Sequence, residues 1–581
     1  MAVASEAIDA GEITQAERQT GGEIMCAALV EEGVRVVFGY PGGAIMPFYD
    51  ALHTCDDLYH VLVRHEQGAT HAADGYARAT GKVGVCVATS GPGATNMVTG
   101  LANAFMDSVP IVAITGQVAR PAIGKDSFQE TDVIGVTIPV TKHNILVRSA
   151  EELGPAIHEA FAIARSGRPG PVLIDVPKDV QFEQAVYRRP ERPPTPLQRS
   201  SSHDEEQLRK AADLMDAAQQ PLIIAGHGVI LSSGYEALRD LAEKTDIPVI
   251  TTLLGISCFP ESHPLSLGMP GMHGSACTNR AIDEADLLLA IGMRFDDRVT
   301  GKISEFAPRA RIIHVDIEAA ELEKVVRTEV AINADARATM ERMGEMVSAR
   351  THEDWRAKIS GWQSPSYRIE HDLPQPVDIL AEIKRVSGGE AILVTDVGQN
   401  QMWSAQHYGY DHPNTHITSG GLGTMGFALP AAMGVKFGQP DAAVWAVAGD
   451  GGFQMNIQEL ATIAAEGLEI KIVIMNNGYL GMVRQWQKFF HGARYSATPI
   501  TSPNYILLAQ AYGLNARRVD HVDEMREAME WAASTPGCTI LDIAIEQERN
   551  VYPMIPSGQS VAAMIEDTVP ERFRTGEAAG E

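Results

Sequence analysis

Glycine, aspartate and asparagine occur together after two apolar runs in the last third of the chain. Gly449-Asp450-Gly451-Gly452 follows the run AVWAVA, and Asn476 and Asn477 follow the run KIVIM. If both runs are neighbouring parallel strands, the Asp450 carboxylate and an asparagine amide meet at the same sheet edge. Oxygen ligands of this kind suit Mg²⁺, which usually also binds phosphate oxygens.

The glycines of this motif let backbone N–H groups approach a diphosphate, and a helix expected from about Met455 adds its dipole. The motif therefore predicts a magnesium-diphosphate site without a phosphate-binding lysine. A tight turn followed by a loop asparagine pair is the structural alternative.

A second glycine motif, Gly421-Leu422-Gly423-Thr424-Met425-Gly426, matches the dinucleotide-binding pattern G-x-G-x-x-G, with Asp441 further along. The preceding segment, NTHITSGG, is a poor candidate for a buried strand, so the motif lacks the context that a nicotinamide site requires. A tight loop that packs a helix against a sheet, or a loop that contacts another cofactor, remains open.

Short apolar runs alternate with helical patterns, such as residues 67–80, along the whole chain. The expected strands are VRVVFGY, HVLV, VGVCVATSGPG, VPIVAITG and GPVLIDVP, then PLIIAGHG, IPVITTL, ADLLLAIGMRF and ARIIHVDI, then AILVTDVG, AAVWAVAGDGG and EIKIVIMNNG. Continuous apolar strands between helices indicate parallel sheets covered on both faces. The fold class is therefore α/β, with three doubly wound parallel-sheet domains.

Two polar breaks, RRPERPPTPLQRSSSH and the residues before DLPQP, separate the three domains. The N-terminus carries acidic residues and no apolar core, so it resembles neither a secretion signal nor a transit peptide. The predicted organisation is a disordered leader (1–20), an N-terminal domain (21–187), a linker (188–203), a central domain (204–350), a linker (351–375), a C-terminal domain (376–562) and a polar tail (563–581).

Composition limits the classes of partner. At 581 residues the chain has room for about three or four domains. Its formal net charge of −27 repels nucleic acid and anionic lipid. The sequence has no apolar run of about 18 residues, so no membrane-spanning helix is expected. Six cysteines without a Cys-x-x-Cys pair suggest no disulfide framework, and the expected compartment is the reducing cytoplasm.

Longer sequence blocks resemble a known family. These blocks are FGYPGGAIMPFYDAL, RHEQGATHAADGYARATGKVGVCVATSGPGATN, FQETD, RFDDRVTGK, GLGTMGFALPAA and GMVRQWQ. Together they resemble the acetolactate synthase (acetohydroxyacid synthase) family of thiamine-diphosphate enzymes, over about residues 20–560. The resemblance implies pyrimidine, central FAD-binding and pyrophosphate domains. It also implies decarboxylation of pyruvate and transfer of a hydroxyethyl unit to pyruvate or 2-oxobutyrate, the first common step towards valine, leucine and isoleucine.

The resemblance also assigns roles to single residues. Glu66 would bond the aminopyrimidine ring and activate the cofactor, and Gln129 and Lys178 would lie near the reacting substrate. Magnesium would be held by Asp450, Asn477 and the carbonyl of Tyr479. The positions implied for thiamine diphosphate are Tyr40, Pro41, Glu66, Pro92, Asn96, Gly398, Gln399, Asn400, Gly423, Met425, Gly449, Gly451, Gly452 and Met482. The family often has histidine in place of Asn400, whose side chain is still expected to donate to phosphate.

For the acceptor substrate, the resemblance implies Arg298 as the carboxylate ligand, with Trp486, Phe128 and Met272 around it. The flavin in this family takes no electrons in the main reaction. Its implied positions are Arg168, Gly226, Gly228, Thr252, Leu253, His273, Arg294, Asp296, Asp316 and Asp335. A homodimer or a dimer of dimers and a small regulatory subunit are implied as well.

Three other functions remain as alternatives. They are a different thiamine enzyme such as pyruvate oxidase or glyoxylate carboligase, a nicotinamide dehydrogenase that uses residues 421–426, and an inactive paralogue kept as a scaffold. The glutamate at position 66 argues against glyoxylate carboligase, which lacks it. Retention of Glu66, Asp450, Asn477 and Arg298 together argues against the scaffold.

Overall fold

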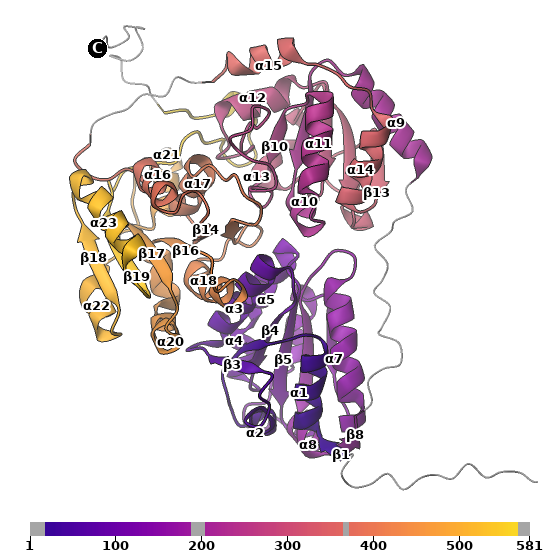
Figure 1. Cartoon of the computed structure of the whole chain (residues 1–581), viewed down its shortest axis with the longest axis vertical. Helices are drawn as coiled ribbons and strands as arrows, with labels where there is room; N and C mark the ends of the chain where they lie inside the picture. The colour runs from indigo at the N-terminus through magenta and orange to yellow at the C-terminus, as the bar shows by residue number, and fades with distance from the viewer. Residues whose placement is uncertain (1–17, 188–203, 364–370, 568–581) are drawn as a thin grey trace, which may run out of the picture.

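The computed structural model describes residues 18–187, 204–363 and 371–567. It contains three parallel sheets in sequence order, each flanked by helices (Figure 1). The prediction of three doubly wound α/β domains is therefore confirmed. Within the described residues, no helix has the length and apolar character needed to cross a membrane.

The N-terminal domain has a six-stranded sheet with alternating core faces. The strand order is β3 (Tyr59–Leu62), β2 (Val36–Gly39), β4 (Gly84–Ala88), β5 (Ile111–Gln117), β7 (Val172–Pro177) and β6 (His143–Leu146). Val85 and Val87 share a core with α1 (Gly21–Glu31), α2 (Met46–Leu52) and α7 (Ala150–Arg165). Cys86 and Ala88 share another with α3 (Glu66–Thr80) and α5 (Val98–Asp107). Both faces are covered, which explains why the strand reads as continuously apolar.

The N-terminal domain begins earlier than predicted. Strand β1 (Arg18–Thr20) pairs antiparallel with β8 (Gln184–Val186), and Thr20 caps α1. The predicted leader 1–20 is therefore wrong for residues 18–20, because their backbone closes a two-stranded ribbon at the end of the domain. Residues 1–17 and the predicted linker 188–203 lie outside the described residues.

The central domain has a five-stranded parallel sheet, with α9 (Glu205–Ala217), α11 (Tyr235–Thr245) and α14 (Ala336–Met346) on one face. The other face carries α12 (Ala276–Glu284) and α15 (Glu353–Ser360). The strand order is β10 (Val249–Thr251), β9 (Pro221–Ala225), β11 (Leu287–Ile291), β12 (Arg311–Asp316) and β13 (Val330–Asn333). Helix α15 falls in the predicted linker 351–375. That prediction is wrong here because Trp355 is buried and donates to the Pro221 carbonyl at 3.0 Å.

The C-terminal domain has a second six-stranded parallel sheet. Its order is β15 (His416–Thr418), β14 (Ile392–Thr395), β16 (Val444–Gly449), β17 (Ile470–Asn476), β19 (Thr539–Ala544) and β18 (Asn515–Val519). One face is covered by α18 (Ala428–Gly438), α20 (Leu460–Glu466) and α22 (Tyr505–Ala511). The other is covered by α16 (Pro376–Val386), α17 (Gln399–His407) and α23 (Val522–Ser534).

Two features of this domain differ from the sequence expectations. The segment NTHITSGG does contain a buried strand, β15, which is only three residues long and pairs with β14. The predicted polar tail from residue 563 is ordered at its start. Ile565 and Met554 exchange two backbone hydrogen bonds, and Ile555 donates to the Met272 carbonyl in the central domain at 2.8 Å. The polar sequence of the tail hid these backbone contacts.

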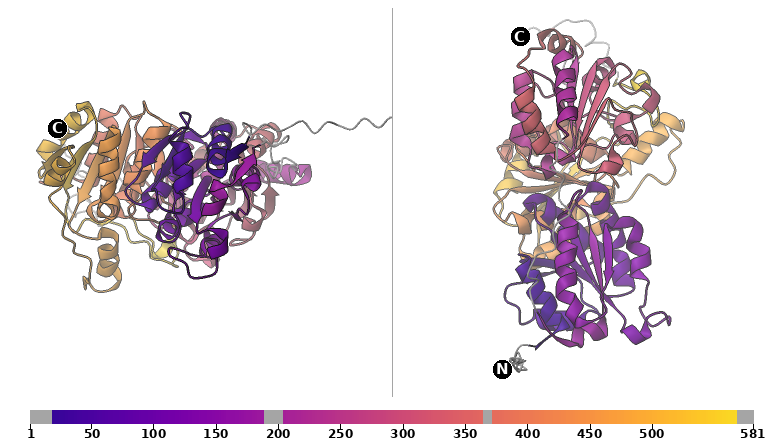
Figure 2. Two further views of the ribbon diagram at one scale, coloured as in Figure 1. Left: turned by 90° about the horizontal axis from the view of Figure 1, so that it is seen from below. Right: turned by 90° about the vertical axis from the view of Figure 1, so that its right-hand side faces the viewer.

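The domains meet closely. The N-terminal and central domains lie one above the other, with the C-terminal domain alongside (Figures 1 and 2). Helix α3 packs closely on α18. A Cβ at Gly434 would lie 1.8 Å from the Ala72 carbonyl oxygen, and one at Gly75 would lie 2.1 Å from that of Ala431. Glycine is therefore required at both positions by the close backbone approach.

Candidate functional site

The predicted neighbours β16 and β17 are adjacent and parallel, with Gly449 opposite Met475. Asp450 begins the short helix α19 (Asp450–Phe453) directly after β16, and Asn477 follows β17. Their side chains therefore end the two strands at one edge of the sheet. The Tyr479 N–H donates to Asn477 Oδ1 at 3.0 Å, so a local turn holds Tyr479 close to Asn477.

Asp450 is 1% exposed, and the Ser502 hydroxyl donates to its Oδ2 at 3.1 Å. Burial raises the pKa of this carboxyl to about 6. Among the described residues no lysine, arginine or histidine forms an ion pair with it. In the same residues no group of three or more His, Cys, Asp or Glu could hold a metal. A cation here would thus use one carboxylate with amide and carbonyl oxygens, a donor set that fits Mg²⁺.

The backbone around Asp450 is shaped for close approach. Gly398, with φ +132°, precedes α17, so the free N–H groups of the first turn of that helix face the same sheet edge. A Cβ at Gly452 would lie 2.1 Å from Asp396 Oδ1, and one at Gly451 would lie 3.7 Å from Met425 Cε. The predicted glycines and Met425 are therefore gathered around the Asp450 loop.

Asn400 does not present its side chain as predicted. Its amide nitrogen donates to the carbonyl oxygens of Asp396 at 3.0 Å and Val447 at 3.1 Å. Both amide hydrogens are thus used by the backbone. In this conformation the side chain has no amide hydrogen left for a phosphate, so the expected donation stays a prediction that needs another orientation of Asn400.

Glu66 is the first residue of α3 and is 9% exposed. Its Oε2 accepts a hydrogen bond from Asn96 Nδ2 at 2.9 Å, and Asn96 ends the short helix α4 (Pro92–Asn96). Gln129, with φ +61°, packs against this helix start, since a Cβ at Gly91 would lie 2.7 Å from the Gln129 carbonyl oxygen. Glu66 is therefore in direct contact with Asn96, and Gln129 packs on the start of the same helix α4.

A cavity of about 1140 Å³ lies where the three domains meet, and we call it the interdomain cavity. This volume exceeds that of most small-molecule sites. Many predicted positions line it: Arg168, Gly228, Thr252, Leu253, His273, Arg294, Asp296, Asp316 and Asp335 for flavin, Met272, Arg298 and Trp486 for the acceptor, and Gly398, Gly423 and Met482 for thiamine diphosphate.

The strand ends of the central domain form one side of the cavity. Gly226 and Gly228 follow β9 and pack against Gly292. A Cβ at Gly226 would lie 2.3 Å from the Gly292 carbonyl oxygen, and one at Gly228 would lie 2.6 Å from the Gly292 Cα. Asp316 ends β12, and burial raises the pKa of its carboxyl to about 6. Arg168 bonds Glu321 at 2.9 Å and brings a cation from the N-terminal domain.

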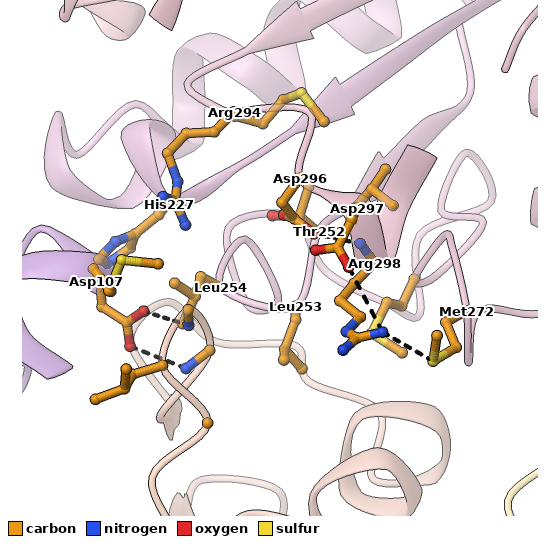
Figure 3. A pocket seen from close by; sticks show the side chains of 18 of the residues that line it. Asp107, His227, Thr252, Leu253, Leu254, Met272, Arg294, Asp296, Asp297 and Arg298 are labelled. Carbon is orange, nitrogen blue, oxygen red and sulfur yellow. Dashed lines mark hydrogen bonds and ion pairs between the residues drawn. The ribbon is translucent and has the colours of Figure 1, made fainter. Parts of the chain in front are cut away.

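Arg298 and Met272 also come from the central domain and lie across the cavity from Asp107 and His227 (Figure 3). The Arg298 guanidinium lies 3.8 Å from Met272 Sδ and 3.7 Å from Asp297 Oδ2, and its side chain is 57% exposed. The local ion pair with Asp297 is therefore loose, and the guanidinium is available to an anionic ligand. Trp486 reaches the cavity from α21 (Gly481–Phe490).

Some predicted residues lie outside this cavity. Glu66, Gln129 and Lys178 do not line it, nor do Asp450 and Asn477. Phe128, which was grouped with the acceptor residues, is 89% exposed on the N-terminal domain. Within one chain, the predicted residues therefore fall into those that line the interdomain cavity and those that lie outside it.

Asp107 and Asp396 are buried acids that the sequence did not single out. Asp107, at the end of α5, accepts the N–H groups of Gly420 at 3.0 Å and Gly421 at 2.6 Å, beside His227 (Figure 3). Burial lowers the pKa of His227 to about 4. Asp396 accepts the N–H groups of Gly426 and Ala428. Asp396 directly follows strand β14, as Asp450 directly follows β16, so the same reasoning from strand ends could have found it. Asp107 gives no comparable signal.

Comparison with known proteins agrees with this geometry. Three domain families match the chain in order: the N-terminal TPP binding domain of thiamine pyrophosphate enzymes over residues 19–136, their central domain over 208–343, and their C-terminal TPP binding domain over 396–543.

Full-length relatives are similar as well. The acetolactate synthase large subunit of Parasynechococcus marenigrum is 47% identical, covering 94% of this chain and 91% of the relative. The acetolactate synthase isozyme 2 large subunit of Escherichia coli is 44% identical, covering 94% and 99%. The probable acetolactate synthase large subunit of Methanocaldococcus jannaschii is 45% identical, covering 94% and 95%.

Proposed function

The chain belongs to the acetolactate synthase large-subunit family of thiamine pyrophosphate enzymes, and from this premise we propose its reaction and the roles of its residues. It decarboxylates pyruvate and transfers the hydroxyethyl unit to a second 2-ketoacid, either pyruvate or 2-oxobutyrate. The products lead to valine and leucine, and to isoleucine.

The observation that supports the proposal most directly is the pair Asp450 and Asn477 at adjacent strand ends. With the carbonyl of Tyr479, these residues would hold Mg²⁺, and the glycines beside them would face the diphosphate. Thiamine diphosphate, when bound, supplies the nucleophilic carbon and accepts the electrons released on decarboxylation. Glu66 would hold the proton exchanged at the aminopyrimidine ring, because it is a buried carboxyl oriented by Asn96.

The residues that line the interdomain cavity support separate places for FAD and for the acceptor ketoacid. Arg168 and Arg294 supply cations on the side of the central domain, where strand ends and glycines leave room for a large cofactor. The guanidinium of Arg298 suits the carboxylate of the acceptor ketoacid. Trp486 lines the same cavity and offers the acceptor an apolar wall.

Assembly forms part of the proposal. Glu66 and Asp450 both lie outside the interdomain cavity, and no hydrogen bond among the described residues joins them. We therefore infer that a second copy of the chain completes the site, so the minimal active unit is a homodimer.

A separate small regulatory subunit is proposed because the relatives are named large subunits. All six cysteines are free thiols, as in proteins of the reducing cytoplasm.

The test is formation of acetolactate from pyruvate by the purified chain with thiamine diphosphate, Mg²⁺ and FAD. Adding 2-oxobutyrate should yield 2-aceto-2-hydroxybutyrate, and omitting thiamine diphosphate should abolish both products. Pyruvate consumption with oxygen uptake and without acetolactate would instead indicate an oxidase. A thermal shift with NADH and none with thiamine diphosphate would favour a dehydrogenase.

A further inference from the structure

A carboxylate of the C-terminal domain binds the backbone of the N-terminal domain directly before Glu66. Glu459 ends the 3-10 helix η6 (Gln454–Glu459), and its two oxygens lie 3.0 and 3.2 Å from the backbone nitrogen of Arg64. The side chain is fully buried, and the Thr462 hydroxyl donates to Oε2 at 2.7 Å. Glu459 is thus held in a fixed position between the two domains.

The start of α3 is built around this carboxylate. His65 caps the helix, because its Nδ1 accepts the backbone N–H of Gln67 at 3.1 Å. The backbone N–H of His65 also faces Glu459. A Cβ at Gly68 would lie only 2.5 Å from Glu459 Oε1. The first turn therefore has room for Glu459 only because position 68 is glycine. A carboxylate near a helix N-terminus is also favoured by the helix dipole.

These contacts limit the freedom of Glu66. The backbone before it is bound by Glu459, and its side chain is bound by Asn96 at 2.9 Å. Since an ionised carboxylate is a stronger hydrogen-bond acceptor than a neutral oxygen, these contacts hold the first turn of α3 at both its backbone and its side chain. The direction of the Glu66 carboxyl is then set partly by a residue of another domain.

We propose that Glu459 is a positioning residue that holds the first turn of α3 in the orientation from which Glu66 acts on the cofactor. The proposal rests on the proposed function. Helix η6 directly follows α19, which begins at Asp450. Glu459 therefore also links the metal-binding end of the C-terminal domain to the start of α3 within one chain.

A neighbouring carboxylate provides a matched control. Glu466 ends α20, and its Oε2 accepts a hydrogen bond from the Tyr59 hydroxyl at 2.6 Å. This contact also joins the C-terminal to the N-terminal domain. It lies at the start of β3, however, whereas Glu66 follows the end of that strand. Losing it tests the domain contact alone.

The experiment uses the full chain with thiamine diphosphate, Mg²⁺ and FAD. The variants are Glu459→Ala, Glu459→Gln and Glu466→Ala, with Glu66→Gln as the benchmark. For each, kcat, cofactor affinity and melting temperature are measured. Deuterium exchange at the reactive carbon of bound thiamine diphosphate, followed by NMR, reports cofactor activation separately from folding.

Glu459→Ala should slow this exchange and kcat by roughly tenfold, less than the roughly hundredfold expected of Glu66→Gln. Glu459→Gln should recover most of the loss, because its amide oxygen still accepts the Arg64 N–H. Glu466→Ala should leave exchange unchanged. Gly68→Ala gives a second route, since its methyl displaces the carboxylate while alanine favours the helix. It should slow exchange to about the same extent as Glu459→Ala, because both changes remove the carboxylate from the Arg64 N–H.

Normal exchange in both Glu459→Ala and Gly68→Ala, with slow exchange in Glu66→Gln, would overturn this inference and leave the proposed function intact. A lower melting temperature with normal exchange would show a structural role and overturn it too. Normal exchange in Glu66→Gln would instead refute the proposed role of Glu66 itself.

Discussion

At the scale of single residues, Asp396 and Asp450 show how similar burial can serve different purposes. Burial raises the pKa of both carboxyls to about 6. Asp396 is bonded by the N–H groups of Gly426 and Ala428, which fasten the glycine loop to its strand end. Asp450 has a serine hydroxyl partner and faces the loop of Asn477. A buried carboxylate is costly without a counter-charge, so Asp450 fits a cation whereas Asp396 fits a structural role.

Asp450→Ala should therefore weaken the binding of thiamine diphosphate in the presence of Mg²⁺ by about 10–100-fold or more. A loss of about 10–100-fold is typical when a residue that only hydrogen-bonds to a metal ligand is changed, and Asp450 would be a ligand itself. The ligand-free protein should keep its melting temperature to within a few degrees, because removing a buried carboxyl that has no cationic partner also removes its desolvation cost. Isothermal titration measures the affinity. Asp441→Ala, at an exposed position of the same domain, is the control. Unchanged affinity in Asp450→Ala would rule out this metal site.

Glu66→Gln keeps the shape of the side chain and the contact with Asn96 but removes its ionisable group. Turnover should fall by about 10²-fold or more, the scale of general acid–base catalysis, while cofactor affinity changes little. Steady-state acetolactate formation and a thiamine diphosphate titration measure the two quantities. Near-normal turnover would contradict the assignment.

At the scale of elements, α21 is fixed by its buried residue Gln485. The carboxamide oxygen of Gln485 accepts from Gln399 at 2.9 Å and from the Val551 N–H at 2.7 Å, and its nitrogen donates to the Val551 carbonyl at 3.0 Å. Helix α21 is thereby attached to the start of α17 and to the segment after β19. The same attachment fixes the position of Trp486, the next residue, at the interdomain cavity.

Trp486→Leu should reduce the preference for 2-oxobutyrate over pyruvate. The two acceptors differ by one methylene, which a pocket distinguishes by only about 1–3 kcal/mol, or roughly 10–200-fold. An indole provides a broad rigid contact for that extra carbon. The product ratio under competition between the two acceptors is the measurement.

Arg298→Ala serves as the comparison, because a ligand of the carboxylate should affect both acceptors alike and leave the ratio unchanged. An unchanged ratio in Trp486→Leu would mean that the tryptophan only packs, as its edge contact with Phe490 at 5.5 Å would allow.

The elements also show what the sequence could predict. Strands β16 and β17 were predictable as neighbours that position Asp450 and Asn477, because long apolar runs followed by polar residues have few other interpretations. Strand β15 was not, since three residues give no periodicity. Helix α15 was missed because its stability depends on the tertiary contact of Trp355 with Pro221, which a polar sequence does not reveal.

At the scale of the whole molecule, the interdomain cavity draws residues from all three domains, and this convergence was not predictable from spacing. Its residues became candidates only through the family resemblance. Asp107 illustrates the difficulty. Its carboxylate joins Arg78 at 2.7 Å to the N–H groups of Gly420 and Gly421, more than 300 positions along the chain. A contact of that separation depends on how the domains dock, which local pattern does not encode.

The division of predicted residues between Glu66 and Asp450 leads to the last prediction. If Glu66 of one chain acts with Asp450 of its partner, a dimer of one Glu66→Gln and one Asp450→Ala chain has one doubly altered site and one intact site. Random exchange makes about half the dimers hybrid, each with half its sites intact, so about a quarter of wild-type activity should return. Two variants of one half-site, Asp450→Ala and Asn477→Ala, should recover nothing when mixed. Absence of recovery in the first mixture, with subunit exchange verified by mass spectrometry, or full activity of a monomer in sedimentation, would show that each chain builds its own site.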